Sequence, residues 1–333
     1  MNTLISINTN KGSIQIDLFG EYTPLTVNNF LNYVNSGAYS NTIIHREATL
    51  SNGQPFIIQG GGYLTSQFTA NPLPATPAHI TQNAAVLNEP KISNLRGTIA
   101  MAKRGSATPE FPDPVNSATT EWFINLNNDN AITSPLSNGQ PGPKLDEQNG
   151  GFTAFGEVVG GGMSVADAIY NLNSVSVPFS AGAFSSVPYD GTNFVTVNSI
   201  TVLGTHAAYQ NPYSTVDINN DGILENLDAQ IIINDLVTNG IHASNTFTGN
   251  QYLYRDSSGN NTIDPLDAQR VINAIILHGT GGAAPPDEES FPGPTHFAAP
   301  AMSAVPEPSA LVLAGMAATG LAYGVWKRRR SRR

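Results

Sequence analysis

Short apolar segments, separated by loops rich in Gly, Pro and Asn, are the feature that most constrains what this chain can fold into. Charged residues make up only 12% of the 333 residues, while Gly and Pro number 31 and 23. Many short strands with few helices favour a closed antiparallel barrel or a sandwich. A hairpin is predicted over residues 4–18, and the further strand candidates are 42–46, 55–59, 97–102, 121–126, 153–158 and 194–203.

Two helices are predicted among these strands. Thr23 can cap the first helix, Pro24 suits its first position, and Gly37 ends it. The second helix is predicted over residues 163–172. The fold class predicted for residues 1–204 is therefore mainly β, with two helices.

The composition changes near Gly204, and an internal repeat follows. Leu227-Asp228-Ala229-Gln230 recurs 39 residues later as Leu266-Asp267-Ala268-Gln269. Beyond the repeat, Gly, Ala and Pro predominate, which is typical of a linker. The predicted division is a first domain over residues 1–204, a linker over 205–216, a second domain over 217–278, a linker over 279–304 and a C-terminal module over 305–333.

The charge of the chain is unevenly distributed. The net charge is −10, but six of the fifteen basic residues lie in the last seven positions, so residues 1–326 carry −16. An acidic body argues against a nucleic-acid partner, because phosphate binding needs a basic face. The chain has no cysteine, which excludes disulfides, thiolate nucleophiles and zinc–thiolate sites.

One cation and one amide lie among apolar residues in the first domain. His45-Arg46 is followed by Phe56-Ile57-Ile58-Gln59-Gly60-Gly61, and two similar segments are Arg96-Gly97-Thr98-Ile99-Ala100-Met101-Ala102 and Glu121-Trp122-Phe123-Ile124-Asn125. Their order and spacing resemble cyclophilins, the proline cis–trans isomerases, over roughly residues 3–204. The resemblance implies an eight-stranded antiparallel barrel capped by two helices.

The same resemblance implies the residues of an active site. Arg46 would be the catalytic guanidinium, Gln59 would contact the substrate backbone, and an apolar pocket would hold the proline ring. The implied catalytic residues are Arg46, Phe56, Gln59 and Phe123, and the implied substrate-binding residues are Ile57, Ala102, Lys103, Glu121, Leu145 and Phe152.

These residue types suit the chemistry of prolyl isomerisation. Rotation about the amide faces a barrier of about 18–20 kcal/mol because resonance stiffens the C–N bond. No bond is broken, so neither a nucleophile nor a cofactor is expected for catalysis. Twisting the amide makes the prolyl nitrogen a better acceptor, and an arginine that donates to it binds the transition state more tightly than the ground state.

Glu121 is the departure from the family pattern that matters most for activity. The family usually has glutamine at this position, and a carboxylate could pair with Arg46 and draw it away from the substrate. The alternative to catalysis is therefore a non-catalytic module that binds proline-containing peptides.

The second domain contains two loops with the ligand pattern of an EF-hand. Oxygen-bearing residues recur at the expected places, with Gly222 at place 6 of the first loop and Asn261 there in the second. Asn tolerates the left-handed backbone that this place requires. The predicted metal ligands are Asp217, Asn219, Asp221, Ile223, Glu225 and Asp228 in the first loop, and Asp256, Ser258, Asn260, Thr262, Asp264 and Asp267 in the second.

Two such loops in tandem, each followed by an apolar helical run, resemble dockerin type I modules. The resemblance implies a small all-α domain that folds around two structural Ca²⁺ ions and binds a cohesin-like partner. Asn226-Leu227 and Pro265-Leu266, however, lie where cellulosomal dockerins commonly place Ser/Thr recognition pairs. A further hypothesis makes this domain the functional centre, with the first domain carried into a cell-surface assembly.

The end of the chain resembles a PEP-CTERM sorting signal. Val305-Pro306-Glu307-Pro308-Ser309 precedes 17 apolar residues, 310–326, and then a basic tail. The resemblance implies a transmembrane helix over 310–326 with the tail in the cytoplasm, and export to the cell envelope or beyond. Residues 1–7 show no secretory signal, so either the true start lies upstream or the sorting signal is vestigial.

Overall fold

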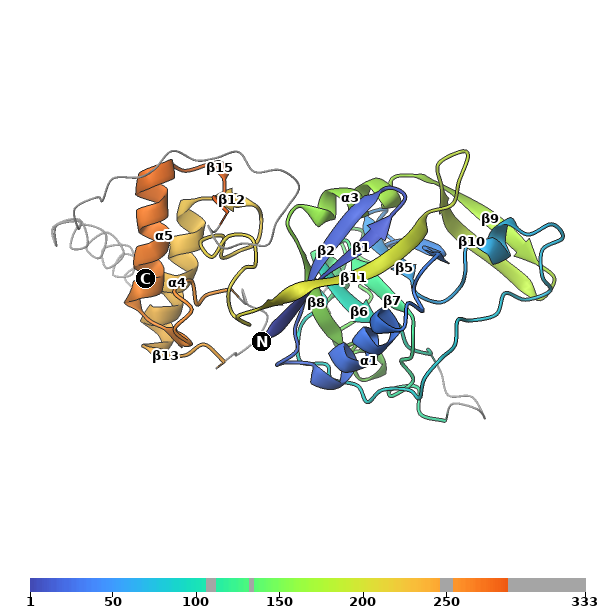
Figure 1. Cartoon of the computed structure of the whole chain (residues 1–333), viewed down its shortest axis with the longest axis horizontal. Helices are drawn as coiled ribbons and strands as arrows, with labels where there is room; N and C mark the ends of the chain where they lie inside the picture. Colours follow the sequence, from blue (N-terminus) through green and yellow to red (C-terminus); the bar gives the residue numbers. More distant parts are fainter. Residues whose placement is uncertain (106–111, 132–134, 246–253, 287–333) are drawn as a thin grey trace. The chain divides into compact units, whose positions relative to one another are not determined.

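The computed structural model describes residues 1–105, 112–131, 135–245 and 254–286 (Figure 1). All of these residues fall within one compact unit, Met1–Phe291. The predicted sorting signal and transmembrane helix, 305–333, lie outside the described residues. Within the described ranges, no helix has the length and apolar character needed to cross a membrane.

The main sheet of the first domain is antiparallel and has nine strands. Its spatial order is β3-β11-β1-β2-β8-β6-β7-β5-β4, and the sheet curls around its buried face (Figure 1). The strands are β1 (Asn2–Thr9), β2 (Gly12–Leu18), β3 (Thr42–Ile43), β4 (Arg46–Thr49), β5 (Pro55–Gly60), β6 (Thr98–Met101), β7 (Trp122–Asn125), β8 (Ala154–Val159) and β11 (Thr196–His206).

The strand count differs from the expected eight because the predicted strand 42–46 breaks. Ile44 donates its N–H to Val195, whereas the next residue, His45, donates to Gln59. The chain therefore leaves the β11 edge after β3 and begins pairing with β5 at β4. This break places Arg46 at the first position of an edge strand.

Two helices accompany the sheet, α1 (Pro24–Asn35) and α3 (Gly162–Tyr170), together with the short α2 (Ser66–Thr69). Thr23 occupies the predicted N-cap position of α1, but its hydroxyl donates to the carbonyl of Phe19 and does not cap the helix. The carboxylate of Glu89 accepts the N–H of Thr26 at 2.9 Å. A negative charge is favourable at a helix N-terminus, so Glu89 caps the helix from a distant loop.

A second hairpin, β9 (Asn173–Phe179) and β10 (Gly182–Tyr189), was not predicted from the sequence. Strand β9 alternates between exposed residues and more buried apolar side chains, and β10 buries Val187 and Pro188. Val177, Phe179 and Val187 pack in one cluster with Ile43 and Phe68. The hairpin therefore covers the region where the chain passes from β3 to β4.

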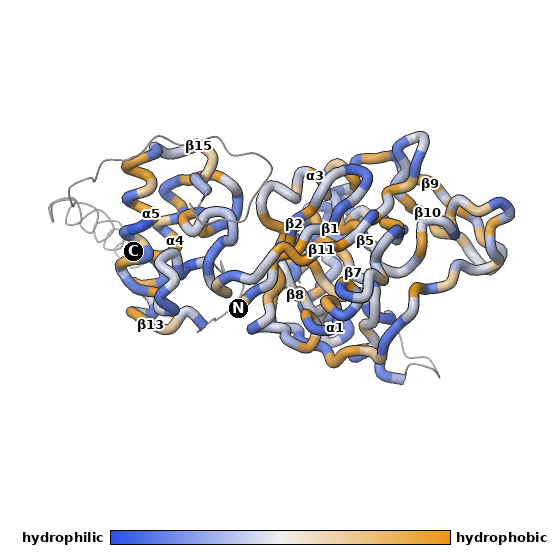
Figure 2. Tube along the Cα trace, viewed as in Figure 1, coloured by the Kyte–Doolittle hydropathy of each residue, from blue (hydrophilic) through white to orange (hydrophobic). Residues whose placement is uncertain are grey.

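The main core lies on the concave face of the sheet. Strand residues such as Ile58, Ile99 and Ile124 pack there with Phe30 of α1 and Trp122, all fully buried. Each such side chain stabilises the fold by roughly 1.5–3 kcal/mol relative to an exposed one. In Figure 2 apolar and polar residues are interspersed along the strands and the connecting loops.

The second domain contains the two predicted helical runs, α4 (Asn226–Asn239) and α5 (Pro265–His278). It is not all-α, because two short antiparallel ladders accompany the helices. Places 7 and 8 of each predicted calcium loop adopt extended backbone and pair with another segment. The ladders join β12 (Ile223–Leu224) to β15 (Gly282–Ala283), and β13 (His242–Ala243) to β14 (Thr262–Ile263).

The predicted linker 205–216 is partly structured. Strand β11 extends to His206, and Ala208 and Tyr209 are buried just beyond it. Hydrogen bonds also connect the segments on either side, since Tyr254 donates to the carboxylate of Asp17 at 3.1 Å. The exact domain boundaries stay a prediction.

Candidate functional site

Three neighbouring strands place the predicted polar and apolar site residues side by side. Arg46 of β4 lies opposite Gln59 of β5, and Gln59 lies opposite Phe123 of β7. Residues opposite each other in a sheet point to the same face, with Cβ atoms about 4.5–5.5 Å apart. The guanidinium Nη1 of Arg46 donates to the Oε1 of Gln59 at 3.1 Å.

The alternation of strand residues separates this site from the main core. Ile58 and Trp122 face the core, whereas their neighbours Ile57 and Phe123 belong to a second apolar cluster. A one-residue change of register would exchange the two sets. The site is therefore formed by the face of β5 and β7 that the core leaves uncovered.

The second cluster brings the predicted apolar residues of the site together. Ile57, Phe123 and Leu145 are buried in it, and the rings of Phe123 and Phe152 meet edge to face at 5.8 Å. Phe56 and Ala102 pack against it as well. Residues that the sequence reading missed are Phe19, Tyr22, Ala48, Ile92, Ala100 and Ala154. Ala100 and Ala154 lie within the predicted strands 97–102 and 153–158, so strand alternation could have found them.

Glu121 contacts two histidines and the side-chain amide of Gln59. Among the described residues, it does not form an ion pair with Arg46. Its Oε1 lies 2.9 Å from His79 Nε2, and its Oε2 lies 3.4 Å from His45 Nε2. Gln59 Nε2 donates to the same Oε2 at 2.7 Å. Burial alone would raise the pKa of Glu121, but the hydrogen bonds and charges of His45 and His79 outweigh it and lower the pKa.

We expect Glu121→Gln to maintain or raise kcat/KM for a proline peptide. A glutamine side chain can still accept the Gln59 amide, and it carries no charge that competes for Arg46. A protease-coupled or NMR exchange assay of both proteins measures the effect. A large loss of kcat/KM would contradict this expectation and would mean that the carboxylate itself is required.

Lys103 fixes one wall of the pocket. Its ammonium donates to the carbonyls of Asn149 and Gly151 at 2.8 and 2.5 Å, and lies 4.9 Å from the ring centre of Phe152. Burial lowers the pKa of Lys103 to about 8, against the raising effect of Asp113. The lysine therefore ties the segment after β6 to the segment before β8.

The lowered pKa of Lys103 predicts a pH-dependent contribution to stability. Its charged form is disfavoured in the folded state, so this penalty is complete below pH 8 and disappears as the pH rises from about 8 to about 10.5, the ordinary lysine value. The free energy of unfolding of the wild type, compared with Lys103→Met, should increase across that window. Denaturant titrations at pH 7.5 and 10 measure it; a difference that does not change with pH would contradict it.

The two predicted calcium loops share one backbone conformation. Places 4 and 6 are left-handed in both, with φ of +56° and +80° at Asn220 and Gly222, and +74° and +63° at Gly259 and Asn261. Place 4 is Asn in the first loop and Gly in the second, and place 6 is Gly in the first and Asn in the second. Both residues tolerate the left-handed backbone that these places require. This conformation accounts for Asn261 at the place where the first loop has glycine.

The carboxylates of both loops point inward at the loop backbone. Asp217 accepts the N–H of Gly222 at 3.0 Å, and Asp256 accepts the N–H of Asn261 at 2.7 Å. Hard oxygen donors of this kind suit Ca²⁺. Within the described ranges, however, the structure contains no group of three or more His, Asp or Glu side chains that could hold a metal ion. The calcium ligands stay a prediction.

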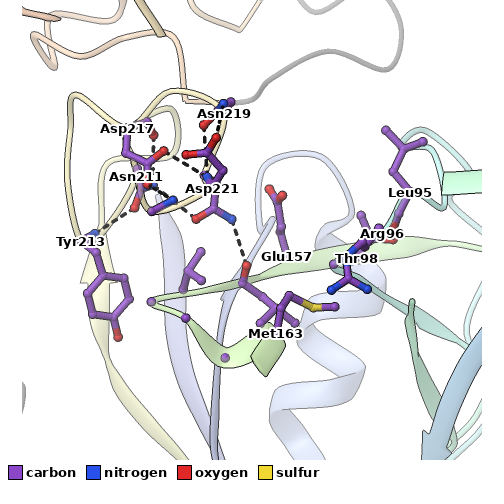
Figure 3. A pocket seen from close by; sticks show the side chains of 18 of the residues that line it. Leu95, Arg96, Thr98, Glu157, Met163, Asn211, Tyr213, Asp217, Asn219 and Asp221 are labelled. Atoms are coloured by element: carbon purple, nitrogen blue, oxygen red, sulfur yellow. Dashed lines mark hydrogen bonds between the residues drawn. The ribbon is translucent and has the colours of Figure 1, made fainter. Parts of the chain in front are cut away.

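A hollow lies beside the first loop. Figure 3 shows Asp217, Asn219 and Asp221 on one side of it and Glu157 of β8 on another. Asn220 of the loop donates to the carbonyl of Val158 at 2.9 Å. The lining of this hollow includes Phe19 and Ile92 of the second apolar cluster, but it does not include Arg46, Phe56 or Phe123.

The fold and the site place an arginine beside an apolar cluster on a curled antiparallel sheet. Comparison with known proteins identifies the family. Residues 4–198 match the family described as "Cyclophilin type peptidyl-prolyl cis-trans isomerase/CLD", and residues 215–282 match the "Dockerin type I domain".

Curated relatives agree with the first match. The chain is 32% identical over 197 residues to a peptidyl-prolyl cis-trans isomerase of Acinetobacter baylyi, covering 59% of this chain and 85% of that protein. It is 34% identical over 169 residues to peptidyl-prolyl cis-trans isomerase B of Escherichia coli, covering 50% of this chain and 83% of that protein. The chain belongs to the cyclophilin-type peptidyl-prolyl cis-trans isomerases and carries a dockerin type I domain.

Proposed function

We propose that this chain accelerates Xaa-Pro isomerisation through Arg46, in proteins that meet it outside the cytoplasm. The observation that supports the role of Arg46 is its hydrogen bond to Gln59 at 3.1 Å, beside the pocket that contains Phe123. The apolar pocket holds the proline ring, and the guanidinium donates to the prolyl nitrogen as the amide twists. Arginine remains charged throughout the accessible pH range, so this donor is always present.

The pocket and the arginine contribute at different stages. Ile57, Phe123 and Leu145 bind the ring equally well in the planar and twisted states, which increases affinity. The new hydrogen bond to the nitrogen exists only in the twisted state, so it lowers the barrier. Exclusion of water by the apolar side chains strengthens that bond.

A direct assay tests the proposal. The complete chain is added to a short Xaa-Pro peptide, and the rate of cis-to-trans exchange is compared with the rate in buffer. We expect a concentration-dependent acceleration. A folded chain that binds the peptide but does not increase the exchange rate would favour the alternative function, a non-catalytic proline-peptide-binding module.

The dockerin domain and the C-terminal segment support the proposed location. In this proposal the domain binds two structural Ca²⁺ ions and a cohesin-like partner, and residues 305–333 direct the chain to the cell envelope as a sorting signal with a membrane helix. Catalysis needs no cofactor. Fractionation of cells that produce the complete chain or the chain without residues 305–333 tests this location. Membrane association of both forms to the same extent would contradict it.

A further inference from the structure

Glu121 is held between two histidines and the amide that orients the catalytic arginine. The hydrogen bonds run in sequence: His79 Nε2 to Glu121 at 2.9 Å, Gln59 Nε2 to Glu121 at 2.7 Å, and Arg46 Nη1 to Gln59 at 3.1 Å. The Gln59 side chain therefore donates through its nitrogen to Glu121 and accepts through its oxygen from Arg46. The carboxylate needs a donor, and the guanidinium needs an acceptor.

The environment of the two histidines favours contact with this carboxylate. The His45 side chain is only 4% exposed, and its ring packs edge to face on Tyr63 and Phe184. The Nδ1 of His45 is buried and has no hydrogen-bond partner among the described residues, so Nε2 is the nitrogen that faces a polar group. His79 is 39% exposed and stacks against Tyr63, with ring centres 4.4 Å apart.

The backbone around Gly62 also confines Glu121. A Cβ atom at this glycine would lie 2.9 Å from Glu121 Oε1, closer than a side chain could be accommodated without movement. The carboxylate therefore occupies the space that the glycine leaves open. Other ionisable groups around Glu121 are Arg46 and the hydroxyls of Tyr39 and Tyr63; burial raises the pKa of both hydroxyls, and the negative charge of Glu121 raises it further.

We propose that His79 is a positioning residue for Arg46. By holding Glu121, it keeps the carboxylate from pairing with the guanidinium and keeps the Gln59 carbonyl directed at Arg46. His45 supports the same carboxylate from the buried side. Without His79, Glu121 loses a hydrogen-bond donor and is free to turn toward Arg46, the nearby cation whose charge it already attracts. Arg46 would then be withdrawn from the prolyl nitrogen.

The proposal rests on the proposed function, and a double-mutant cycle on the complete chain tests it. The variants are His79→Leu, His79→Gln, Glu121→Gln and His79→Leu combined with Glu121→Gln. Because His79→Leu removes a hydrogen bond to a charged group, we expect kcat/KM of this variant to fall by about tenfold. The fall should appear in kcat rather than in KM, because Arg46 acts in the twisted state.

Rescue distinguishes positioning from a structural role. His79→Gln keeps a donor at this place, so its kcat should remain near that of the wild type. The double variant should also recover, because the neutral amide that replaces the Glu121 carboxylate does not capture Arg46. His278→Leu, which removes a histidine from the end of α5, is the control for loss of a histidine elsewhere.

The outcomes separate the two proposals. A slow His79→Leu that recovers when Glu121→Gln is added supports the inference. A His79→Leu variant as active as the wild type overturns it, and so does a loss that Glu121→Gln does not restore, with circular dichroism confirming that the variants are folded. An inactive wild type, or an Arg46→Ala variant as active as the wild type, overturns the proposed function and the inference together.

Discussion

Replacing Arg46 with alanine is expected to lower kcat/KM by about 10²–10³-fold, the range observed when one preorganised donor to a transition state is removed. The reason is differential binding. The guanidinium contacts the prolyl nitrogen only when the amide twists, so its loss raises the barrier without changing how the ring is held. Arg46 is exposed on an edge strand, and its hydrogen-bond partner Gln59 is half-buried, so we expect the variant to fold.

Binding and turnover should therefore separate in this variant. The dissociation constant of a proline peptide, measured by titration calorimetry or NMR, should change by less than about tenfold, because Ile57, Phe123 and Leu145 still form the pocket. Arg270→Ala on α5 is the matched control, since it removes an exposed arginine outside the pocket. Equal losses of binding and turnover would show that Arg46 acts as a ground-state contact, and unchanged turnover would remove it from the mechanism.

Arg46→Lys distinguishes charge from geometry. Lysine keeps the positive charge but replaces a planar guanidinium with a point charge on a flexible stem. Because Arg46 is oriented by the carbonyl of Gln59, we expect the lysine variant to remain at least about tenfold below the wild type. Full activity in the lysine variant would mean that a positive charge alone is sufficient.

Strand periodicity allowed most of the first domain to be predicted from the sequence. The hairpin at residues 4–18 was found because its apolar residues alternate, and the strands around residues 55–59 and 121–126 were found as short apolar segments between loops. The pocket residues were named from the family resemblance, and the structure places Ile57 and Ile58 in different apolar clusters. Arg46 and Gln59 were named from the family pattern, and the strand register places them opposite each other.

What escaped prediction depends on contacts between distant segments. Glu89 reaches the N-terminus of α1 across 63 residues, and no local pattern distinguishes it from any other loop glutamate. His79 meets Glu121 across 42 residues, so the sequence suggested Arg46 as the partner of Glu121. The β9–β10 hairpin was missed because its serines and Pro178 are typical of a loop, and its strand character depends on packing against Phe68.

Removing calcium is expected to destabilise the dockerin domain and leave isomerisation unchanged. At a free calcium concentration about a thousand times the dissociation constant, each occupied site stabilises the folded state by about 4 kcal/mol. A chelator should therefore unfold residues 217–278 and abolish the far-UV signal of α4 and α5. The exchange rate of an Xaa-Pro peptide should remain within about twofold, because no predicted ligand lies in the pocket.

Two variants and a control make this test specific. Asp217→Ala and Asp256→Ala each remove the first ligand of one loop, so each should lower the midpoint of thermal unfolding in calcium, and the pair should have the largest effect. Asp129→Ala removes a carboxylate from the 3₁₀ turn Asn128–Asn130, outside both loops, and should have the same response to calcium as the wild type. Helices that persist in the chelator would contradict the prediction.

The physical argument for such a dependence is the size of the core. The buried apolar residues of the second domain are few, and several are as small as Ala229, Ala268 and Val271. Domains below about 70–80 residues rarely obtain more than about 3–5 kcal/mol from a single core and are usually strengthened by disulfides or metal ions. The chain has no cysteine, so disulfides are excluded. The carboxylates of the first loop also favour a bound cation. Burial and then the charges of Asp228 and Asp221 raise the pKa of Asp217 to about 7, and a bound cation would offset both effects.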